Sequence, residues 1–475
     1  MKIKVNGTPQ EIEAGLNVTN LLVRNQVEQP DMVSVQLNGE FVPREQFTST
    51  MFREGDEVDF LYFMGGGSGF TTRAIHTPFL KKDPHGALHM PVYDSVSFEF
   101  ETAEETEEAF LGKRPRHMYT RITNPTVEHL EQKIKHVTGA LAVLAVSSGM
   151  AAIANTILSI ARQGDNLITT KFLFGHTYSL FERTLRHWGI ETRYADFSRP
   201  ESIEPLIDTR TRALFFETIT NPQLQVADIV ALAAIARRRK ILLIADTTLT
   251  PLYFFNGRDQ GVDIEVLSGT KYLSGGATTI GGLIIDNGTY DWTHNPTLEK
   301  EARQFGPYTL VTKLRREVYR NLGACLSPHN AYLQSLGLET LALRADQSCR
   351  NTQVLAEFLS GHPKVKKVNY PGLGSSPYHA VAVRIFGQHC GALMTFELSS
   401  KQECFAFLNK LKLLRRATTL NDNKTLALHP ASTIFCEYPA DQRLAMGVPE
   451  TLIRIAVGIE DVEDLIADIA QALED

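Results

Sequence analysis

Two stretches of this sequence decide its fold: ILLIADTTLT at residues 241–250 and EVLSGTKYLSGG at residues 265–276. Each begins with a short, mainly apolar run and passes directly into a turn of small and polar residues. A short apolar run is typical of a strand that is buried on both faces of a sheet. The turn that follows such a strand is where α/β proteins place their ligand-binding residues.

Similar runs recur along the middle of the chain and are separated by stretches of helical length. The predicted strands are 141–146, 167–170, 214–217, 241–245 and 265–267. This alternation predicts an α/β fold in which helices cover both faces of a mostly parallel sheet. Towards the C-terminus, a long leucine-bearing helical stretch leads into a mixed region, which predicts a smaller α/β domain.

The first residues predict a separate small unit. Ile3 and Val5 alternate with lysines before an Asn6-Gly7 turn, a helix is expected from Asn17, and strands are expected at 33–37 and 57–63. This order is that of a β-grasp domain, and a glycine-rich stretch follows it. The predicted organisation is a β-grasp domain at 1–66, a linker at 67–70, an arm at 71–130, a large domain at 131–325 and a small domain at 326–475.

Three turns after predicted strands carry candidate functional residues. The turn at 148–150 opens a helix, whose free N–H groups and dipole favour a phosphate. Asp246 can pair with a cationic ring nitrogen, and Lys271 offers an amine that burial keeps neutral. Each has an ordinary alternative: a helix cap, a turn aspartate and a solvated lysine. Together they match what pyridoxal phosphate (PLP) requires, which makes 131–325 the predicted cofactor-binding domain.

Composition excludes several other classes. The net charge of -6 and the absence of like-charge blocks give no reason to expect nucleic acid or a membrane surface as a partner. Five scattered cysteines without a CxxC pair favour a reducing compartment and predict neither a disulfide framework nor a metal site. No apolar run has the length of a signal peptide core or a membrane span. We therefore expect a cytoplasmic protein.

From about residue 70 to its end, the chain resembles the trans-sulfuration (Cys/Met metabolism) family of PLP enzymes. Nine motifs in order carry the resemblance: YTRITNPTVEHLE, AVSSGMAAI, FGHTYSLF, ETITNPQLQVADI, IADTTLTP, SGTKYLSGG, LGLETLALR, LHPAST and LIRIAVGIED. The resemblance implies a fold-type I PLP transferase. It also implies a homotetramer whose active sites are shared across a dimer.

The resemblance further implies roles for single residues. Lys271 would form the Schiff base and move protons, and Asp246 would pair with the ring nitrogen. The implied phosphate contacts are Ser148, Gly149, Met150, Ser268 and Thr270, with Tyr119 and Arg121 reaching the phosphate of a neighbouring subunit. Asn221 would lie near the ring hydroxyl. Arg454 would grip the substrate α-carboxylate, with Asn221 and Thr419 as further substrate contacts.

Two departures from the family pattern narrow the chemistry. The family's ring-stacking tyrosine matches Phe174 here, which can stack but cannot exchange a proton unless Tyr178 approaches. That makes a lyase less favoured. The second departure is the stretch TTLNDNKTLALHPAST, which resembles the sulfhydrylase branch more than the lyase and cystathionine-synthase branch. The resemblance thus implies an O-acetylhomoserine sulfhydrylase that makes homocysteine for methionine biosynthesis from O-acetylhomoserine and a sulfur donor.

Other activities stay open at this stage. Cystathionine γ-synthase, cystathionine γ-lyase and methionine γ-lyase are alternatives within the family. An alternative of another class is a tethered sulfur-carrier docking complex.

The N-terminal unit resembles the ubiquitin-like sulfur carriers of thiamine and molybdopterin biosynthesis through LNGEFVPREQF and FREGDEVDFLYFMGGG. Such carriers bear sulfur as a thiocarboxylate on a terminal Gly-Gly, here Gly65 and Gly66. Because more than four hundred residues follow Gly66, this function requires a processing protease and a carrier-activating enzyme. Otherwise the domain docks without carrying sulfur, or the fusion is engineered.

Overall fold

The computed structural model describes residues 1–13, 15–25, 27, 33–62, 69–80, 83–114 and 116–474. They form two compact units, residues 1–73 and residues 74–475. The predicted carrier tail at Gly65 and Gly66 lies outside the described residues. The finer boundaries predicted within the second unit stay predictions.

The first unit is a β-grasp fold, as predicted. Its sheet has the order β2-β1-β5-β3-β4. The strands are β1 Lys2–Val5, β2 Thr8–Glu11, β3 Val33–Leu37, β4 Glu40–Phe41 and β5 Glu57–Tyr62. The helix α1 (Val18–Arg24) begins at the predicted Asn17, whose side chain accepts a hydrogen bond from the Asn20 N–H at 2.9 Å. Val5, Leu21 and Val35 lie in the core between helix and sheet.

The second unit is built on a seven-stranded sheet with the order β6-β12-β11-β10-β9-β7-β8. Its strands are β6 Ala142–Val146, β7 Asn166–Thr169, β8 Glu191–Tyr194, β9 Thr211–Glu217, β10 Leu242–Asp246, β11 Ile264–Ser268 and β12 Gly282–Asp286. The strands from β8 to β11 are parallel, whereas β12 runs antiparallel to both β11 and β6. The mostly parallel sheet predicted from the sequence is therefore confirmed.

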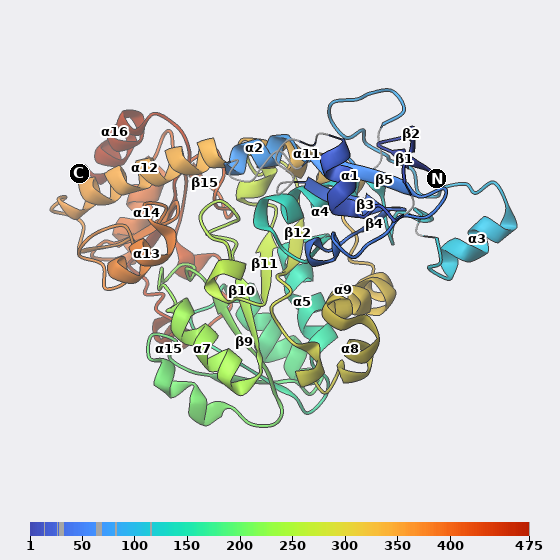
Figure 1. Cartoon of the computed structure of the whole chain (residues 1–475). Coiled ribbons are helices and arrows are strands. Elements are labelled where there is room, and N and C mark those ends of the chain that lie inside the picture. Colours follow the sequence, from blue (N-terminus) through green and yellow to red (C-terminus); the bar gives the residue numbers. More distant parts are fainter. Residues whose placement is uncertain are drawn as a thin grey trace. The chain divides into compact units, whose positions relative to one another are not determined.

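Helices cover both faces of this sheet, which explains its apolar strands. All seven residues of β9 are buried. The helix α5 (Gly149–Ile160) packs on β11 and β12, and α7 (Ile229–Arg239) packs on β9 and β10 (Figure 1). The helix α2 Phe70–Ile75 spans the boundary between the two units. The other helices of the second unit that precede or flank the sheet are α3 Ala103–Phe110, α4 Pro125–Thr138, α6 Gly175–Ser179, α8 Glu299–Phe305, α9 Thr309–Lys313 and α10 Tyr319–Leu322.

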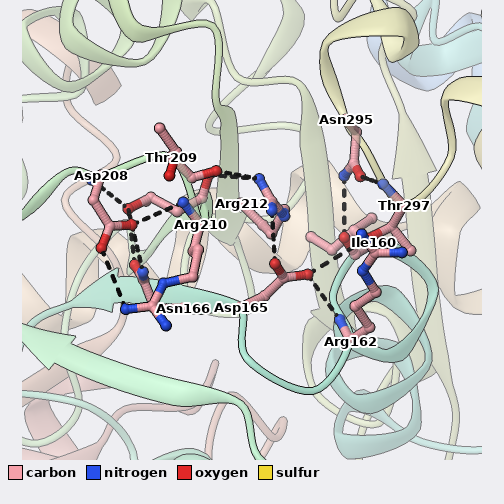
Figure 2. A network of polar contacts seen from close by, with 11 residues as sticks. Ile160, Arg162, Asp165, Asn166, Asp208, Thr209, Arg210, Arg212, Asn295 and Thr297 are labelled. Carbon is pink, nitrogen blue, oxygen red and sulfur yellow. Dashed lines mark hydrogen bonds and ion pairs between the residues drawn. The ribbon is translucent and has the colours of Figure 1, made fainter.

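A polar network fixes the amino ends of β7 and β9 (Figure 2). Arg212 Nη2 donates to Asp165 Oδ1 at 2.6 Å, and both side chains are buried. The other oxygen of Asp165 accepts the Arg162 N–H at 3.0 Å. Nearby, Asn166 Nδ2 donates to Asp208 Oδ1 at 2.9 Å. The starts of these strands are thus held together, while their carboxyl ends open towards the site.

A second, smaller sheet follows in the same unit, with the order β13-β14-β17-β16-β15. Its strands are β13 Lys367–Asn369, β14 Leu393–Glu397, β15 Arg415–Arg416, β16 Leu426–Leu428 and β17 Leu452–Ala456. Its helices are α11 Pro328–Glu339, α12 Leu341–Ser360, α13 His379–Phe386, α14 Lys401–Lys410, α15 Ala440–Ala445 and α16 Val462–Leu473. Within the described part of the chain, no helix is long and apolar enough to cross a membrane.

Candidate active site

A cavity of about 350 Å³ lies at the carboxyl ends of the large sheet's strands. Residues of the small sheet close it from the other side. Of the predicted site residues, those that line it are Ser148, Gly149, Met150, Phe174, Asn221, Asp246, Ser268, Thr270, Lys271, Thr419 and Arg454. They are distant in sequence, and the fold brings them together.

The turn after β6 forms a tight cradle at the start of α5. Ser148 caps the helix, and its Oγ accepts the Ala151 N–H at 3.1 Å. A Cβ added at Gly149 would lie 2.8 Å from the Cβ of Ser268, and one at Gly282 would lie 2.1 Å from the carbonyl oxygen of Ser148. Only glycine fits these two close approaches. The helix N-terminus and the nearby hydroxyl of Ser268 suit a phosphate.

The hydroxyl of Thr270 is already engaged at the edge of this cradle. It donates to the Gly281 carbonyl at 3.3 Å and accepts the Gly281 N–H at 3.1 Å. Its contact with a phosphate, implied by the family resemblance, stays a prediction.

Two carboxyls lie side by side at the ends of β9 and β10. Asp246 and Glu217 are partners in the strand register. Burial raises the pKa of Asp246, although the N–H of Thr248 donates to its Oδ1 at 2.9 Å and opposes the shift. Burial, and then the charge of Asp246, raise the pKa of Glu217 well above its ordinary value. Two buried neighbouring carboxyls do not both ionise readily, and the pKa is raised further at Glu217, which feels the charge of Asp246.

Glu217 also links two walls of the cavity. Its Oε1 accepts the backbone N–H of Phe174 at 2.6 Å, and its Oε2 accepts that of Asn221 at 3.2 Å. We did not expect Glu217 in the site from the sequence. Its signal was present, because it ends an apolar strand as Asp246 does.

Lys271 lies in the turn after β11, where its Nζ donates to Thr419 Oγ1 at 3.0 Å. Burial, with a smaller contribution from the charge of Arg454, lowers its pKa to about 8. A larger fraction of this amine is therefore neutral near neutral pH than in an ordinary lysine, and the neutral form is the one that attacks an aldehyde.

Arg454 is a buried cation, only 1% exposed, in the central strand β17. Its Nη1 donates to Asn221 Oδ1 at 3.1 Å, and its Nη2 donates to the carbonyl oxygens of Thr418 at 3.3 Å and Thr419 at 3.0 Å. Among the described residues no carboxylate pairs with it, and its Nε is buried without a partner. A buried cation held only by neutral oxygens is prepared for an anionic ligand.

The aromatic wall of the cavity is Phe174. Tyr178 does not replace the missing tyrosine, since its ring stacks on Tyr194 at 5.7 Å and its edge meets Tyr438. None of the described residues that line the cavity is a tyrosine. The protein thus presents a flat apolar surface where the family pattern has a phenol.

Tyr119 and Arg121 do not line the cavity of their own chain. Tyr119 is exposed, Arg121 lies over its ring at 5.3 Å, and Arg121 Nη1 donates to the Arg320 carbonyl at 2.7 Å. Their predicted contact with the phosphate of a neighbouring subunit stays a prediction.

The cavity also has lining residues that the sequence did not single out. They are Ile153, His176, Thr177, Glu217, Ile219, Thr248, Leu249, Thr418, Leu420 and Ile434. Several stand inside the motifs quoted above, so motif matching alone does not separate contact residues from their neighbours.

These groups fit a PLP cofactor. The glycine cradle suits its phosphate, Asp246 its ring nitrogen, Phe174 its ring face and Lys271 its aldehyde. Residues 71–474 match the family described as Cys/Met metabolism PLP-dependent enzyme. The chain belongs to that family. PLP is therefore its cofactor, and the predicted enzyme class is confirmed.

Relatives within the Cys/Met metabolism family have more than one activity. L-Methionine gamma-lyase of Pseudomonas putida is 36% identical over 408 residues, covering 86% of this chain and 97% of the relative. O-Acetyl-L-homoserine sulfhydrylase of Corynebacterium glutamicum is 35% identical over 422 residues, covering 84% and 96%. Identity to named relatives thus fixes the family without choosing between lyase and sulfhydrylase.

Two solved structures agree with the fold. A putative O-acetylhomoserine (thiol)-lyase of Campylobacter jejuni, solved with N'-pyridoxyl-lysine-5'-monophosphate, has a TM-score of 0.80 and 32% identity, covering 86% of this chain and 100% of its own. An O-acetylhomoserine sulfhydrylase of Wolinella succinogenes, described with a novel mechanism of sulfur transfer in methionine biosynthesis, has a TM-score of 0.69 and 44% identity, with the same coverage. Separately, residues 3–67 match the ThiS family, which agrees with the predicted carrier-like domain.

Proposed function

We propose that the second unit is an O-acetylhomoserine sulfhydrylase, which replaces the acetate at the substrate γ-carbon by sulfur and so makes homocysteine. The observation that carries the proposal is that Arg454 and Lys271 line the same cavity, together with Phe174. A buried cation with no acidic partner among the described residues, next to an amine whose pKa burial lowers to about 8, suits an amino acid that is held by its carboxylate. A wall without a phenol favours replacement by an external nucleophile over elimination.

The protein's residues divide the work as follows. PLP, when bound, supplies an electron sink for the α-carbon of the substrate. Asp246 would hold the ring nitrogen of the bound cofactor, beside Glu217, whose pKa is raised by burial and by the charge of Asp246. Lys271 Nζ removes the proton from the substrate α-carbon and later returns a proton. Arg454 orients the substrate, so that the α-proton faces Lys271.

A direct assay tests this assignment. The purified protein, loaded with PLP, is mixed with O-acetylhomoserine and sulfide, and homocysteine is quantified. We expect stoichiometric formation of homocysteine and acetate. A fully loaded protein that forms no homocysteine would refute the assignment.

A Lys271→Ala variant is the matched control. It should lose both turnover and the visible absorbance of the bound cofactor, and turnover without Lys271 would disprove the role of this amine.

Methionine γ-lyase is the second candidate, because the P. putida relative of that name is as similar as the C. glutamicum sulfhydrylase. Ammonia and 2-oxobutyrate released from methionine would support it. We expect this release to be slow, since elimination without an incoming nucleophile benefits most from the phenol that Phe174 replaces.

We further propose that the N-terminal unit supplies the sulfur as a thiocarboxylate. The ThiS match over residues 3–67 supports this proposal. A protease would have to cut after Gly66, and an activating enzyme would have to modify the new carboxylate. Intact mass measurement of the protein from its native host should reveal a species ending at Gly66, whereas an exclusively intact chain would favour a tethered docking role.

The assembly belongs to the same proposal. We expect a homotetramer in the cytoplasm, in which Tyr119 and Arg121 complete the phosphate site of a neighbouring subunit. The exposure of Tyr119 supports this, because a polar-tipped aromatic ring stacked under an arginine is suited to an interface.

A further inference from the structure

His176 is a cavity-lining residue without an assigned task. It lies in α6, two residues after Phe174, and its ring meets the Phe174 ring edge-on at 5.0 Å and 68°. The side chain is exposed, so it stands where the cavity opens to solvent. Within the described part of the chain, no hydrogen bond or ion pair holds its ring nitrogens. They are therefore available to a substrate that enters the cavity.

The other titratable groups of the cavity are already committed. Lys271 Nζ bonds Thr419 and serves the α-carbon, while Asp246 and Glu217 are buried at the ring-nitrogen end. Arg454 stays charged, since burial lowers its pKa only to about 10. None of these groups exchanges a proton at the mouth of the cavity.

Tyr438, which contacts α6, does not supply a group that exchanges protons at the cavity either. Tyr438 OH donates to the Gly175 carbonyl at 2.9 Å, and burial raises the pKa of Tyr438 to about 12. This phenol therefore stays neutral and directed at the backbone. An imidazole, with an ordinary pKa of about 6.5, is the side chain suited to proton exchange near neutral pH.

A second residue of the same helix, Thr177, also presents a polar group to the cavity. Thr177 lines the cavity, is 1% exposed, and its Oγ1 has no partner among the described residues. Buried hydroxyls normally have a hydrogen-bond partner. The wall formed by α6 is thus polar at two adjacent positions, next to the apolar ring of Phe174.

We propose that His176 is the proton-transfer group for the γ-carbon half-reactions, in place of the phenol that Phe174 lacks. This rests on the proposed γ-replacement activity and extends it. As the bond from Cγ to the ester oxygen breaks, its electrons leave with the carboxylate, the electrons of a Cβ–H bond form a Cβ–Cγ double bond, and the neutral His176 imidazole takes the Cβ proton. When hydrosulfide attacks, a sulfur lone pair forms the new bond to Cγ, and the double-bond electrons take the proton back from the imidazolium at Cβ.

The two transfers return His176 to its starting protonation state. Their sum is ester plus hydrosulfide giving thiol plus carboxylate, so no oxidant, reductant or further reactant is needed. A general acid–base group typically contributes about 10²- to 10⁴-fold in rate. That range sets the size of the effect to be measured.

The test compares His176→Gln with His187→Gln in the PLP-loaded full chain. His187 is an exposed histidine that does not line the cavity, which makes it a matched control. Two rates are followed for each protein: γ-replacement of O-acetylhomoserine by sulfide, and exchange of the substrate α-proton in D₂O. The second rate reports on Lys271 and the cofactor alone.

We expect His176→Gln to lower γ-replacement by about 10²-fold or more, with α-proton exchange and the cofactor spectrum close to wild type. Adding Phe174→Tyr to His176→Gln should restore part of the loss, because it returns the phenol. The His187→Gln control should behave as wild type.

Three outcomes would overturn the proposal. The first is γ-replacement by His176→Gln at the wild-type rate, which rejects the role of His176 and leaves the proposed function intact. The second is a parallel loss of α-proton exchange, which marks His176 as a structural residue. The third is a wild-type protein that exchanges the α-proton and forms no homocysteine, which removes the proposed function and this inference with it.

Discussion

Replacing Arg454 should separate carboxylate recognition from cofactor chemistry. A guanidinium has about five N–H donors. Three hydrogen bonds go to Asn221, Thr418 and Thr419. This leaves about two donors for the substrate carboxylate, and a hydrogen bond to a charged group contributes about 1.5–3 kcal/mol.

The expected losses follow from this count. Arg454→Lys keeps the charge but loses one directed bond, so kcat/KM for O-acetylhomoserine should fall about 10- to 150-fold, at about 1.4 kcal/mol per factor of ten. Arg454→Gln loses the charge and both bonds, and should fall roughly 10²- to 10⁴-fold. The absorbance of the bound cofactor should not change in either variant.

A substrate that lacks the α-carboxylate supplies the decisive control. With the wild-type protein, kcat/KM for the decarboxylated amine ester should be lower than kcat/KM for O-acetylhomoserine. The factor should be about the same as the one by which Arg454→Gln lowers kcat/KM for O-acetylhomoserine. When the Arg454→Gln variant is given the decarboxylated ester, kcat/KM should be little lower than with either change alone. If the two losses multiply, Arg454 does not contact the carboxylate and the assignment is wrong.

Three further predictions concern the cofactor end of the cavity. Gly149→Ala should weaken PLP binding in a titration followed by absorbance, because its Cβ would lie 2.8 Å from the Cβ of Ser268. Gly374→Ala is the control: its Cβ would meet nothing within 4 Å, so this variant should bind PLP as wild type does. The rate at which apoenzyme takes up PLP should rise about tenfold per pH unit at pH values below the Lys271 pKa of about 8, because only the neutral amine attacks the aldehyde. A stopped-flow rate that does not change with pH in this range would contradict this prediction. Asp246→Asn should slow α-proton exchange about 100-fold, equivalent to about 3 kcal/mol for one lost charged hydrogen bond, and wild-type exchange rates in this variant would show that the ring nitrogen needs no carboxylate.

Local signals in the sequence were sufficient for much of the fold. The strands ending at Val146, Glu217 and Asp246 were predictable because burial on both sheet faces requires apolar side chains throughout. Asn17 marked a helix start because its side chain satisfies a free N–H group of the first turn. The turns bearing Gly149 and Lys271 were predictable as ligand sites because each follows such a strand.

Other features depend on pairings that no local pattern contains. The antiparallel strand β12 inserts between β6 and β11, which brings Gly282 against the Ser148 carbonyl and tightens the phosphate cradle. The register of β9 and β10 sets Glu217 beside Asp246. A change in the position or register of one strand would change either arrangement. The sequence of a single strand does not specify its partner or its register, so neither arrangement can be predicted from it.

The sequence by itself determined which side chains carry chemistry, since an amine, a carboxylate and a guanidinium keep their character in any fold. It also determined that Phe174 offers no proton. Only the tertiary structure decided their states: burial lowers the pKa of Lys271, and Arg454 has no acidic partner among the described residues. It also decided that His176, an exposed residue, lines the cavity. The physical reason is that pKa values and contacts depend on neighbours separated by up to hundreds of residues along the chain.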